Sequence, residues 1–199
     1  MKVLILSPYA DLIDETVERH DHIPIVRSET MEVSDWPEAD WVVSFGYRKI
    51  IQGHTIEKFR GRIINIHLSL LPYNRGADPN FWSWFDGTPK GVTIHRVAPG
   101  IDTGDILVQR ELHDGAASEF RPPYTLETTY MDLLVAASGL FKKYWDVISK
   151  EKVKGKPPTG NWSYHTSREK DKFFNRLPLG WATPVHDISK LGAIYWGKK

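Results

Sequence analysis

The chain contains no cysteine among its 199 residues. This absence excludes disulfide bonds, thiolate nucleophiles and cysteine-ligated metal sites, and it fits a reducing compartment. A long hydrophobic run is also missing near the start, where the apolar residues 3–6 are too few for a signal peptide or a membrane span. We therefore expect a cytoplasmic protein that has no membrane partner.

The chain also has no large excess of positive or negative charge. Lysine and arginine total 26 against 25 aspartate and glutamate residues, so no strong field attracts a phosphate backbone and we expect no nucleic acid partner. With 41% hydrophobic and 26% charged residues, the composition is that of a globular chain long enough for one well-buried domain.

Two common kinds of ligand site are not predicted. The turn at residues 7–11, after the first expected strand, has no glycine, so its backbone cannot easily cradle a phosphate and no dinucleotide site is expected there. His20 and His22, with Asp21 between them, have no distant third ligand, and we predict no metal site.

Apolar runs and helical patterns alternate along the chain. Strands are predicted at residues 3–6, 23–26, 41–45, 61–67, 91–97 and 106–110, and helices at 12–19, 56–59, 80–85 and 125–150. This alternation predicts an α/β protein with a doubly wound, mostly parallel sheet flanked by helices, its main domain covering residues 1–150. The aromatic-rich segment 151–199 is expected to pack on that domain as a short C-terminal extension, because its rings would otherwise form an exposed apolar patch.

Polar side chains stand at the ends of two expected strands. Asn65 and His67 alternate with isoleucines, and residues i and i+2 of a strand point to the same side, so the two share a face. Asp102 lies just beyond the carboxyl end of another strand, the region where open α/β sheets bind ligands. An amide, an imidazole and a carboxylate are the groups needed to move an acyl group between nitrogens. His95 is expected to be a half-buried sheet residue.

The same residues resemble those of the folate-dependent formyltransferase family. That family combines an Asn-x-His strand end, a Ser-Leu-Leu-Pro loop and a later Asp-x-Gly turn, which here are Asn65 with His67, residues 69–72, and Asp102 with Gly104. The resemblance spans roughly residues 41–110 and implies a Rossmann-like formyltransferase domain, which we expect to be the main domain at residues 1–150.

The resemblance also implies a reaction, the transfer of a formyl group from N10-formyltetrahydrofolate to a primary amine. Asn65 would donate to the oxyanion that forms on attack, helped by His67 if that ring is protonated, and losing one such donor typically slows catalysis about 10²-fold to 10³-fold. His67 would move the proton between the nitrogens, with Asp102 orienting the ring or a bridging water.

A folate pocket follows from the same resemblance. The family lines its pterin pocket largely with backbone and apolar groups, from the segment before the catalytic strand and from the turn before the aspartate. The corresponding positions are Tyr47, Arg48, Lys49, Ile50, Ile51, Ala98, Pro99, Gly100 and Ile101.

The run at residues 74–83 is most similar to family members that formylate amino groups on nucleotide-linked sugars, which makes such a sugar the leading acceptor. Arg75 is predicted to hold a phosphate, Asp78 a hydroxyl or an amine, and Trp82 a sugar or base, with Asn74 completing the acceptor site. Trp82 also belongs to a group of aromatic residues at helical spacing, and such residues usually pack in a core.

Other members of the family supply alternatives. Glycinamide ribonucleotide formyltransferases carry a Gly-Ser-rich phosphate loop after the first strand, from which residues 8–10 depart. Enzymes that act on initiator tRNA add a long basic C-terminal domain, and formyltetrahydrofolate hydrolases add an N-terminal regulatory domain; we expect neither here. A non-catalytic binding protein on the same scaffold stays an alternative, and a homodimer is left open.

Overall fold

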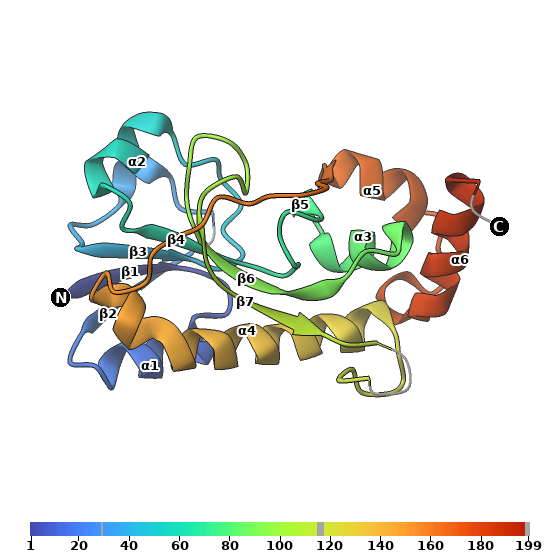
Figure 1. Ribbon diagram of the computed structural model, residues 1–199, viewed down its shortest axis with the longest axis horizontal. Helices are drawn as coiled ribbons and strands as arrows, with labels where there is room; N and C mark the ends of the chain where they lie inside the picture. The colour runs from blue at the N-terminus through green and yellow to red at the C-terminus, as the bar shows by residue number, and fades with distance from the viewer. Residues whose placement is uncertain (29, 115–117, 198–199) are drawn as a thin grey trace. The chain divides into compact units, whose positions relative to one another are not determined.

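The computed structural model describes residues 1–28, 30–114 and 118–197, and its larger sheet has six strands in the order β2-β1-β3-β4-β6-β7 (Figure 1). These are β1 (Lys2–Leu6), β2 (Ile23–Arg27), β3 (Trp41–Ser44), β4 (Ile63–His67), β6 (Lys90–Arg96) and β7 (Ile106–Leu112). Strands β2, β1, β3 and β4 pair in parallel, and β6 pairs antiparallel to β4. The chain passes from β1 to β2 on one side and to β3 on the other, so the sheet is doubly wound and mostly parallel, as predicted.

Helices and a second, two-stranded sheet make up the other described elements. The α-helices are α1 (Asp14–Glu18), α2 (Gly53–Phe59), α3 (Pro79–Asp86), α4 (Leu126–Ser149), α5 (Ser167–Phe174) and α6 (Val185–Tyr195). Strands β5 (Arg75–Gly76) and β8 (Tyr164–His165) pair in parallel. None of these helices combines the length and the apolar character that a membrane crossing requires, over the segments that the structure describes.

Two predictions of local structure were incomplete. The helix expected at residues 12–19 is a 3₁₀ turn at Ala10–Leu12 followed by α1. The weakly periodic tail contains α5 and α6, which the sequence pattern did not predict. Helix α5 starts at a capping box, in which Thr166 and Glu169 bond each other's backbone N–H groups. Hydrogen bonds from the Thr166 backbone and hydroxyl lower the pKa of the Glu169 carboxyl, so local capping stabilises this helix start.

The chain divides into two compact units built from interleaved segments. The first unit comprises Met1–His67, Thr93–Gln109 and Ala137–Pro158, and the second comprises Leu68–Val92, Arg110–Ala136 and Thr159–Lys199. Strands β6 and β7 and helix α4 each continue from one unit into the other. The expected domain division at residue 150 stays a prediction.

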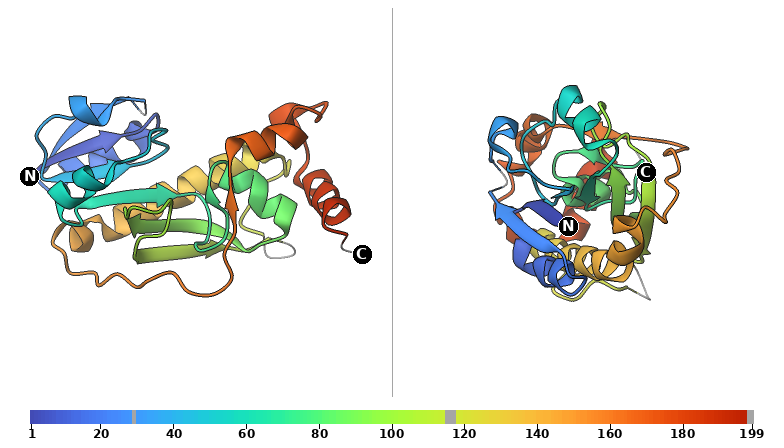
Figure 2. Two further views of the ribbon diagram at one scale, coloured as in Figure 1. Left: turned by 90° about the horizontal axis from the view of Figure 1, so that it is seen from above. Right: turned by 90° about the vertical axis from the view of Figure 1, so that its left-hand side faces the viewer.

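In the first unit, helices cover both faces of the parallel strands (Figure 2). Helix α2 lies on one face, where Phe59 packs with a cluster formed by Leu4, Leu6, Val42 and Ile63. The C-terminal part of α4 lies on the other face, where the Trp145 and Trp41 ring centroids are 5.9 Å apart. Because both faces are buried, these strands read as continuous apolar runs.

In the second unit, the residues of α3 from Asn80 to Phe85 are all buried. Helix α6 comes so close to α3 that a Cβ at Gly192 would lie 1.7 Å from the carbonyl oxygen of Phe85. The rings of Phe173 and Tyr195 also contact Phe85, with centroids 4.7 and 5.7 Å away. Aromatic residues after residue 159 thus pack around α3.

Two helical glycines give a matched test of this contact. Gly192→Ala is expected to destabilise the protein by about 1–3 kcal/mol, because α6 must shift away from Phe85. Gly139→Ala in α4, where the added Cβ meets no described atom within 4 Å, should stabilise it by up to about 1 kcal/mol through helix propensity. Urea unfolding measures both changes, and the same sign for both variants would contradict the proposed role of Gly192.

Candidate active site

Strands β4 and β6 bring an amide and two imidazoles together in the first unit. Asn65 and His67 lie on β4, and the antiparallel register places His95 of β6 directly opposite Asn65. Both histidines are buried and Asn65 is half-buried. The two imidazole centroids are 6.4 Å apart, close enough for both rings to reach one shared partner.

That partner is Asp102, which a tight turn holds in position. A Cβ at Gly104 would lie 1.9 Å from the carbonyl oxygen of Arg96, so only glycine fits there. The Arg96 N–H donates to the carbonyl of Asp105 at 2.9 Å and closes the turn against the end of β6. Asp102 itself has a φ of +50°, a left-handed conformation that is uncommon outside glycine and concentrates at functional sites.

The Asp102 carboxylate joins all three side chains. Its Oδ1 accepts from Asn65 Nδ2 at 3.3 Å and lies 3.4 Å from His95 Nε2, and its Oδ2 lies 3.6 Å from His67 Nδ1. The Asp102 and His67 side chains are both nearly inaccessible to water, which strengthens electrostatic interactions between them. The structure therefore brings the predicted residues Asn65, His67 and Asp102 into one network, which we call the Asp102 network together with His95.

The orientation of the Asn65 amide follows from its neighbours. The Ser44 hydroxyl of β3 donates to Asn65 Oδ1 at 2.8 Å. A flipped amide would place its oxygen 3.3 Å from an Asp102 carboxylate oxygen, and two acceptors at that distance repel each other. The Asn65 NH₂ group therefore faces Asp102 and His95.

The tautomer of His95 follows in the same way. His95 Nδ1 lies 2.8 Å from the Arg96 carbonyl, which can only accept, so Nδ1 carries a hydrogen. Nε2 lies 3.2 Å from Asn65 Nδ2 and accepts from it when the ring is neutral. A hydrogen on Nδ1 thus satisfies the contact with Arg96, and Nε2 faces both Asn65 Nδ2 and Asp102 Oδ1.

Sequence reasoning missed two members of this site, Ser44 and His95. The prediction that His95 is half-buried was wrong, since only 1% of it is exposed. Its role depends on the long-range pairing of β6 with β4, which the alternation of residues along one strand does not reveal. Ser44 was predicted only as part of a strand.

The predicted folate segments belong to the first unit. Tyr47 packs on Trp36, its hydroxyl donates to the Met31 carbonyl at 2.8 Å, and burial raises the pKa of that hydroxyl. Lys49 forms an ion pair with Glu32 at 2.8 Å. These contacts give both side chains a structural role, and their contact with folate stays a prediction.

The other predicted folate positions are more accessible. Arg48, Pro99 and Gly100 are exposed, and Ala98 and Ile51 are half-buried. Two large apolar side chains, Ile50 with 65% of its surface exposed and Ile101 with 41%, project from the two segments. Exposed apolar side chains of this kind suit a flat, partly apolar ligand.

The four predicted acceptor residues belong to the second unit. Asn74 is fully buried, donates to Asp86 at 3.4 Å and accepts from the Thr88 hydroxyl at 2.7 Å. Trp82 is buried and stacks on His165, with ring centroids 3.8 Å apart. Both residues therefore have structural roles, and their substrate contacts stay predictions.

The two charged residues of this set differ from each other. Asp78 accepts from Lys170 at 2.9 Å. The Arg75 guanidinium lies 5.7 Å from the centre of the Trp162 ring, and its buried Nε has no hydrogen-bond partner within the described part of the chain. Arg75 thus has unused hydrogen-bonding capacity, as does Trp82, whose buried Nε1 also has no partner among the described residues.

Comparison with known proteins identifies the family. Residues 18–118, about half of the chain, match the family model described as Formyl transferase. The crystal structure of the formyltransferase PseJ from Anoxybacillus kamchatkensis, in complex with UDP-4,6-dideoxy-4-formamido-L-AltNAc and tetrahydrofolate, is 37% identical, with a TM-score of 0.85 over 96% of this chain and 100% of that one. The chain belongs to the formyl transferase family.

Two curated members of the formyl transferase family with 34% and 42% identity match over shorter stretches. The methionyl-tRNA formyltransferase of Thermodesulfovibrio yellowstonii is 34% identical over 68% of this chain and 42% of its own length. That of Solibacter usitatus is 42% identical over 45% of this chain and 29% of its own length. The chain therefore spans less than half the length of these two relatives.

The Asp102 network has groups that can stabilise a developing negative charge and groups that can remove a proton from a bound reactant. The Asn65 N–H groups can donate to a developing oxyanion, and His67 can accept a proton while Asp102 stabilises the resulting cation. Over the described residues, no group of three or more histidine, aspartate or glutamate side chains is arranged to hold a metal ion.

The tautomer of His95 can be measured directly. Long-range ¹H–¹⁵N NMR spectra, with His95→Gln used for assignment, are expected to show a hydrogen on Nδ1 of His95, because the Arg96 carbonyl fixes that hydrogen. A ring protonated only at Nε2 would contradict the proposed orientation of Asn65.

Proposed function

We propose that this chain is an N-formyltransferase that moves the formyl group of N10-formyltetrahydrofolate to a primary amine on a nucleotide-linked sugar. The observation that carries the proposal is the convergence of Asn65, His67 and Asp102 in one buried network. A protein that only binds ligands has no need for that convergence, which disfavours a non-catalytic role.

The formyl donor is supported by family membership and by the tetrahydrofolate in the PseJ crystal. When bound, it supplies an activated formyl group and a nitrogen leaving group. The side chains of this chain that would hold it are the exposed residues of the segments 47–51 and 98–101, with Ile50 and Ile101 as apolar contacts. The turn at 98–101 directly precedes Asp102 in the sequence, so a ligand held by this turn would lie close to the network.

The residues of the network divide the chemistry between them. As an acceptor amine attacks the formyl carbon, negative charge develops on the formyl oxygen, and an N–H of Asn65 donates to it. The two resting contacts of Asn65 Nδ2, at 3.2 and 3.3 Å, are longer than the usual 2.9–3.0 Å, so the hydrogens are oriented without being tightly bonded. His67 takes the proton from the attacking nitrogen and returns it to the leaving nitrogen, while Asp102 stabilises the charged ring.

An amino sugar linked to a nucleotide is the acceptor that the comparisons favour. PseJ, similar over its whole length, was crystallised with a formylated amino sugar on UDP. Methionyl-tRNA formyltransferases are less similar: two match over 29% and 42% of their lengths, and that of Bacillus thuringiensis matches over 67% of its length at 25% identity, which gives less support to an initiator tRNA acceptor than the 37% identity of PseJ over its whole length gives to an amino sugar. The first turn has no glycine for a phosphate, which disfavours glycinamide ribonucleotide. A cytoplasmic location, a homodimer and the exclusion of nucleic acid stay predictions from the sequence.

Steady-state kinetics test the assignment. With N10-formyltetrahydrofolate and the 4-amino precursor of the UDP-sugar found in the PseJ crystal, Asn65→Ala is expected to lower kcat about 10²-fold to 10³-fold through loss of the oxyanion donor. His67→Ala is expected to lower it about 10²-fold to 10⁴-fold through loss of the proton carrier.

His186→Ala is the matched control, because this histidine is largely exposed on α6 and pairs only with its neighbour Asp187 among the ion pairs of the described residues. It should leave kcat unchanged. Wild-type rates in both site variants would refute the mechanism, and turnover with glycinamide ribonucleotide or initiator tRNA in place of the amino sugar would refute the acceptor.

A further inference from the structure

A cavity of about 430 Å³ lies in the second unit, outside the Asp102 network. Its lining residues are Tyr73, Asp86, Thr88, Asn161, Trp162, Ser163 and Trp196. Of these, none was predicted from the sequence as a site residue. The volume falls in the range of about 300–1,000 Å³ that is typical of small-molecule sites.

Arg75 supplies a positive charge next to this cavity. Its guanidinium lies over Trp162, one of the lining residues, and its Nε is buried without a partner in the described segments. A buried donor that makes no hydrogen bond is costly, so most are paired, and an orphaned one calls for an explanation such as a bound ion or ligand. The planar guanidinium matches the geometry of a phosphate, to which it donates two parallel hydrogen bonds.

Two tryptophans that line the cavity are exposed to solvent. Trp162 is 66% exposed and Trp196 is 50% exposed, although indole rings are normally buried in a protein. Aromatic side chains stabilise a bound nucleobase by stacking on its flat face. An exposed indole beside an arginine whose Nε has no partner among the described residues therefore suits a ligand that joins a flat ring to a phosphate.

Hydrogen-bonding groups in the cavity fit the edge of a base. Asn161 offers an amide, which can both donate and accept as an Asn side chain does when it reads a base edge. Ser163 and Thr88 are already oriented: Ser163 Oγ accepts from the Asn74 N–H at 2.9 Å, and the Thr88 hydroxyl donates to Asn74 Oδ1 at 2.7 Å.

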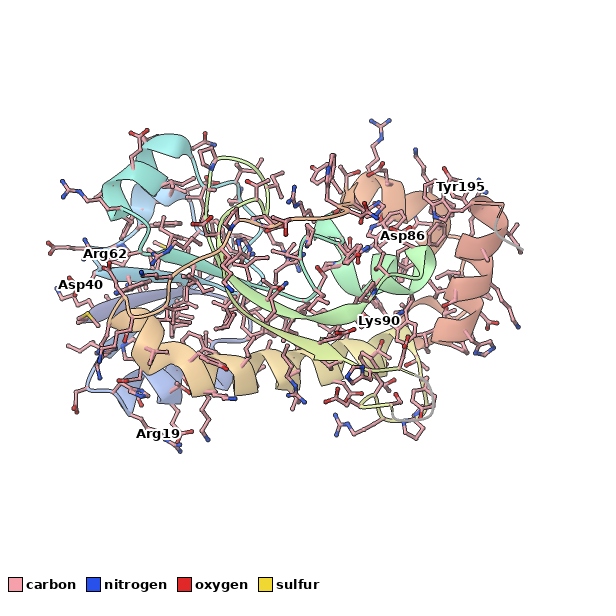
Figure 3. The ribbon with its side chains drawn as sticks, viewed as in Figure 1. Arg19, Asp40, Arg62, Asp86, Lys90 and Tyr195 are labelled. Carbon is pink, nitrogen blue, oxygen red and sulfur yellow. The ribbon has the colours of Figure 1, made fainter. Side chains whose placement is uncertain are left out.

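The wall of the cavity is held rigid by Asp86, labelled in Figure 3. Its carboxylate accepts from His165 Nε2 at 2.7 Å, from Trp196 Nε1 at 3.1 Å and from Asn74 Nδ2 at 3.4 Å. These donors come from β8, from the end of α6 and from the loop before β5. A cavity preorganised in this way loses less entropy when a ligand binds.

We propose that this cavity binds the nucleoside diphosphate portion of the acceptor, with the base against Trp162 and the diphosphate on Arg75. The proposal rests on the proposed function, since it gives the nucleotide-linked acceptor its place on the chain. It assigns Trp162 and Asn161 as specificity determinants, and it assigns Asn74 and Asp86 as positioning residues.

Calorimetric titration of the full chain with UDP, without any formyl donor, tests the proposal. Wild-type protein is expected to bind UDP, and Trp162→Ala to weaken binding about tenfold or more, with Trp162→Phe restoring most of it through stacking. Arg75→Gln should also weaken binding of UDP, and it should have little effect on binding of uridine, which has no phosphate.

Trp181→Ala is the matched control, since Trp181 is also exposed in the second unit but contacts Phe174 and does not line the cavity. It should bind UDP as wild type does. UDP binding that is unaffected by both Trp162→Ala and Arg75→Gln, or absent from wild type, would overturn the proposal. The titration measures binding and not formyl transfer, so its outcome is separate from that of the kinetic assay. If UDP binds at this cavity but no amino sugar is formylated, only the proposed function is overturned.

Discussion

A buried carboxylate that collects an amide and two imidazoles is the constraint on which the rest of the site depends. Asp102 contacts Asn65, His67 and His95, and its left-handed backbone is tolerated because Gly104 lets the turn close against Arg96. A charged group that is nearly inaccessible to water must be paired, so the carboxylate orders the groups around it. The arrangement of Asn65, His67 and His95 thus follows from the need to surround the buried Asp102 carboxylate with polar protein groups.

Residues outside the network determine the orientation of the Asn65 amide and the position of the hydrogen on His95. Ser44 orients the amide of Asn65, and the Arg96 carbonyl fixes the hydrogen on His95. With its oxygen occupied by Ser44, the Asn65 amide presents only donors to the site. A site that presents donors where negative charge develops stabilises a transition state without reorganising.

The local sequence pattern predicted some residues of this site, and the others come together only through pairing of strands that are far apart in the sequence. The shared face of Asn65 and His67 follows from the two-residue period of a strand, and the Asp-x-Gly turn was recognised as a motif. His95 was misjudged because its partner across the sheet is 30 positions away and runs in the opposite direction. The cavity beside Arg75 was not predicted at all, because β5 meets β8 only after nearly ninety intervening residues.

The most direct measurement on the central interaction is the single-turnover rate of formyl transfer in Asp102→Asn. Asparagine keeps the size of the side chain and tolerates the left-handed backbone, so the variant removes the charge and little else. A fall of about 10²-fold or more in the rate, with unchanged folding by circular dichroism, is expected because His67 loses the charge that stabilises its protonated form. A rate equal to that of wild type would show that the carboxylate does not organise the chemistry.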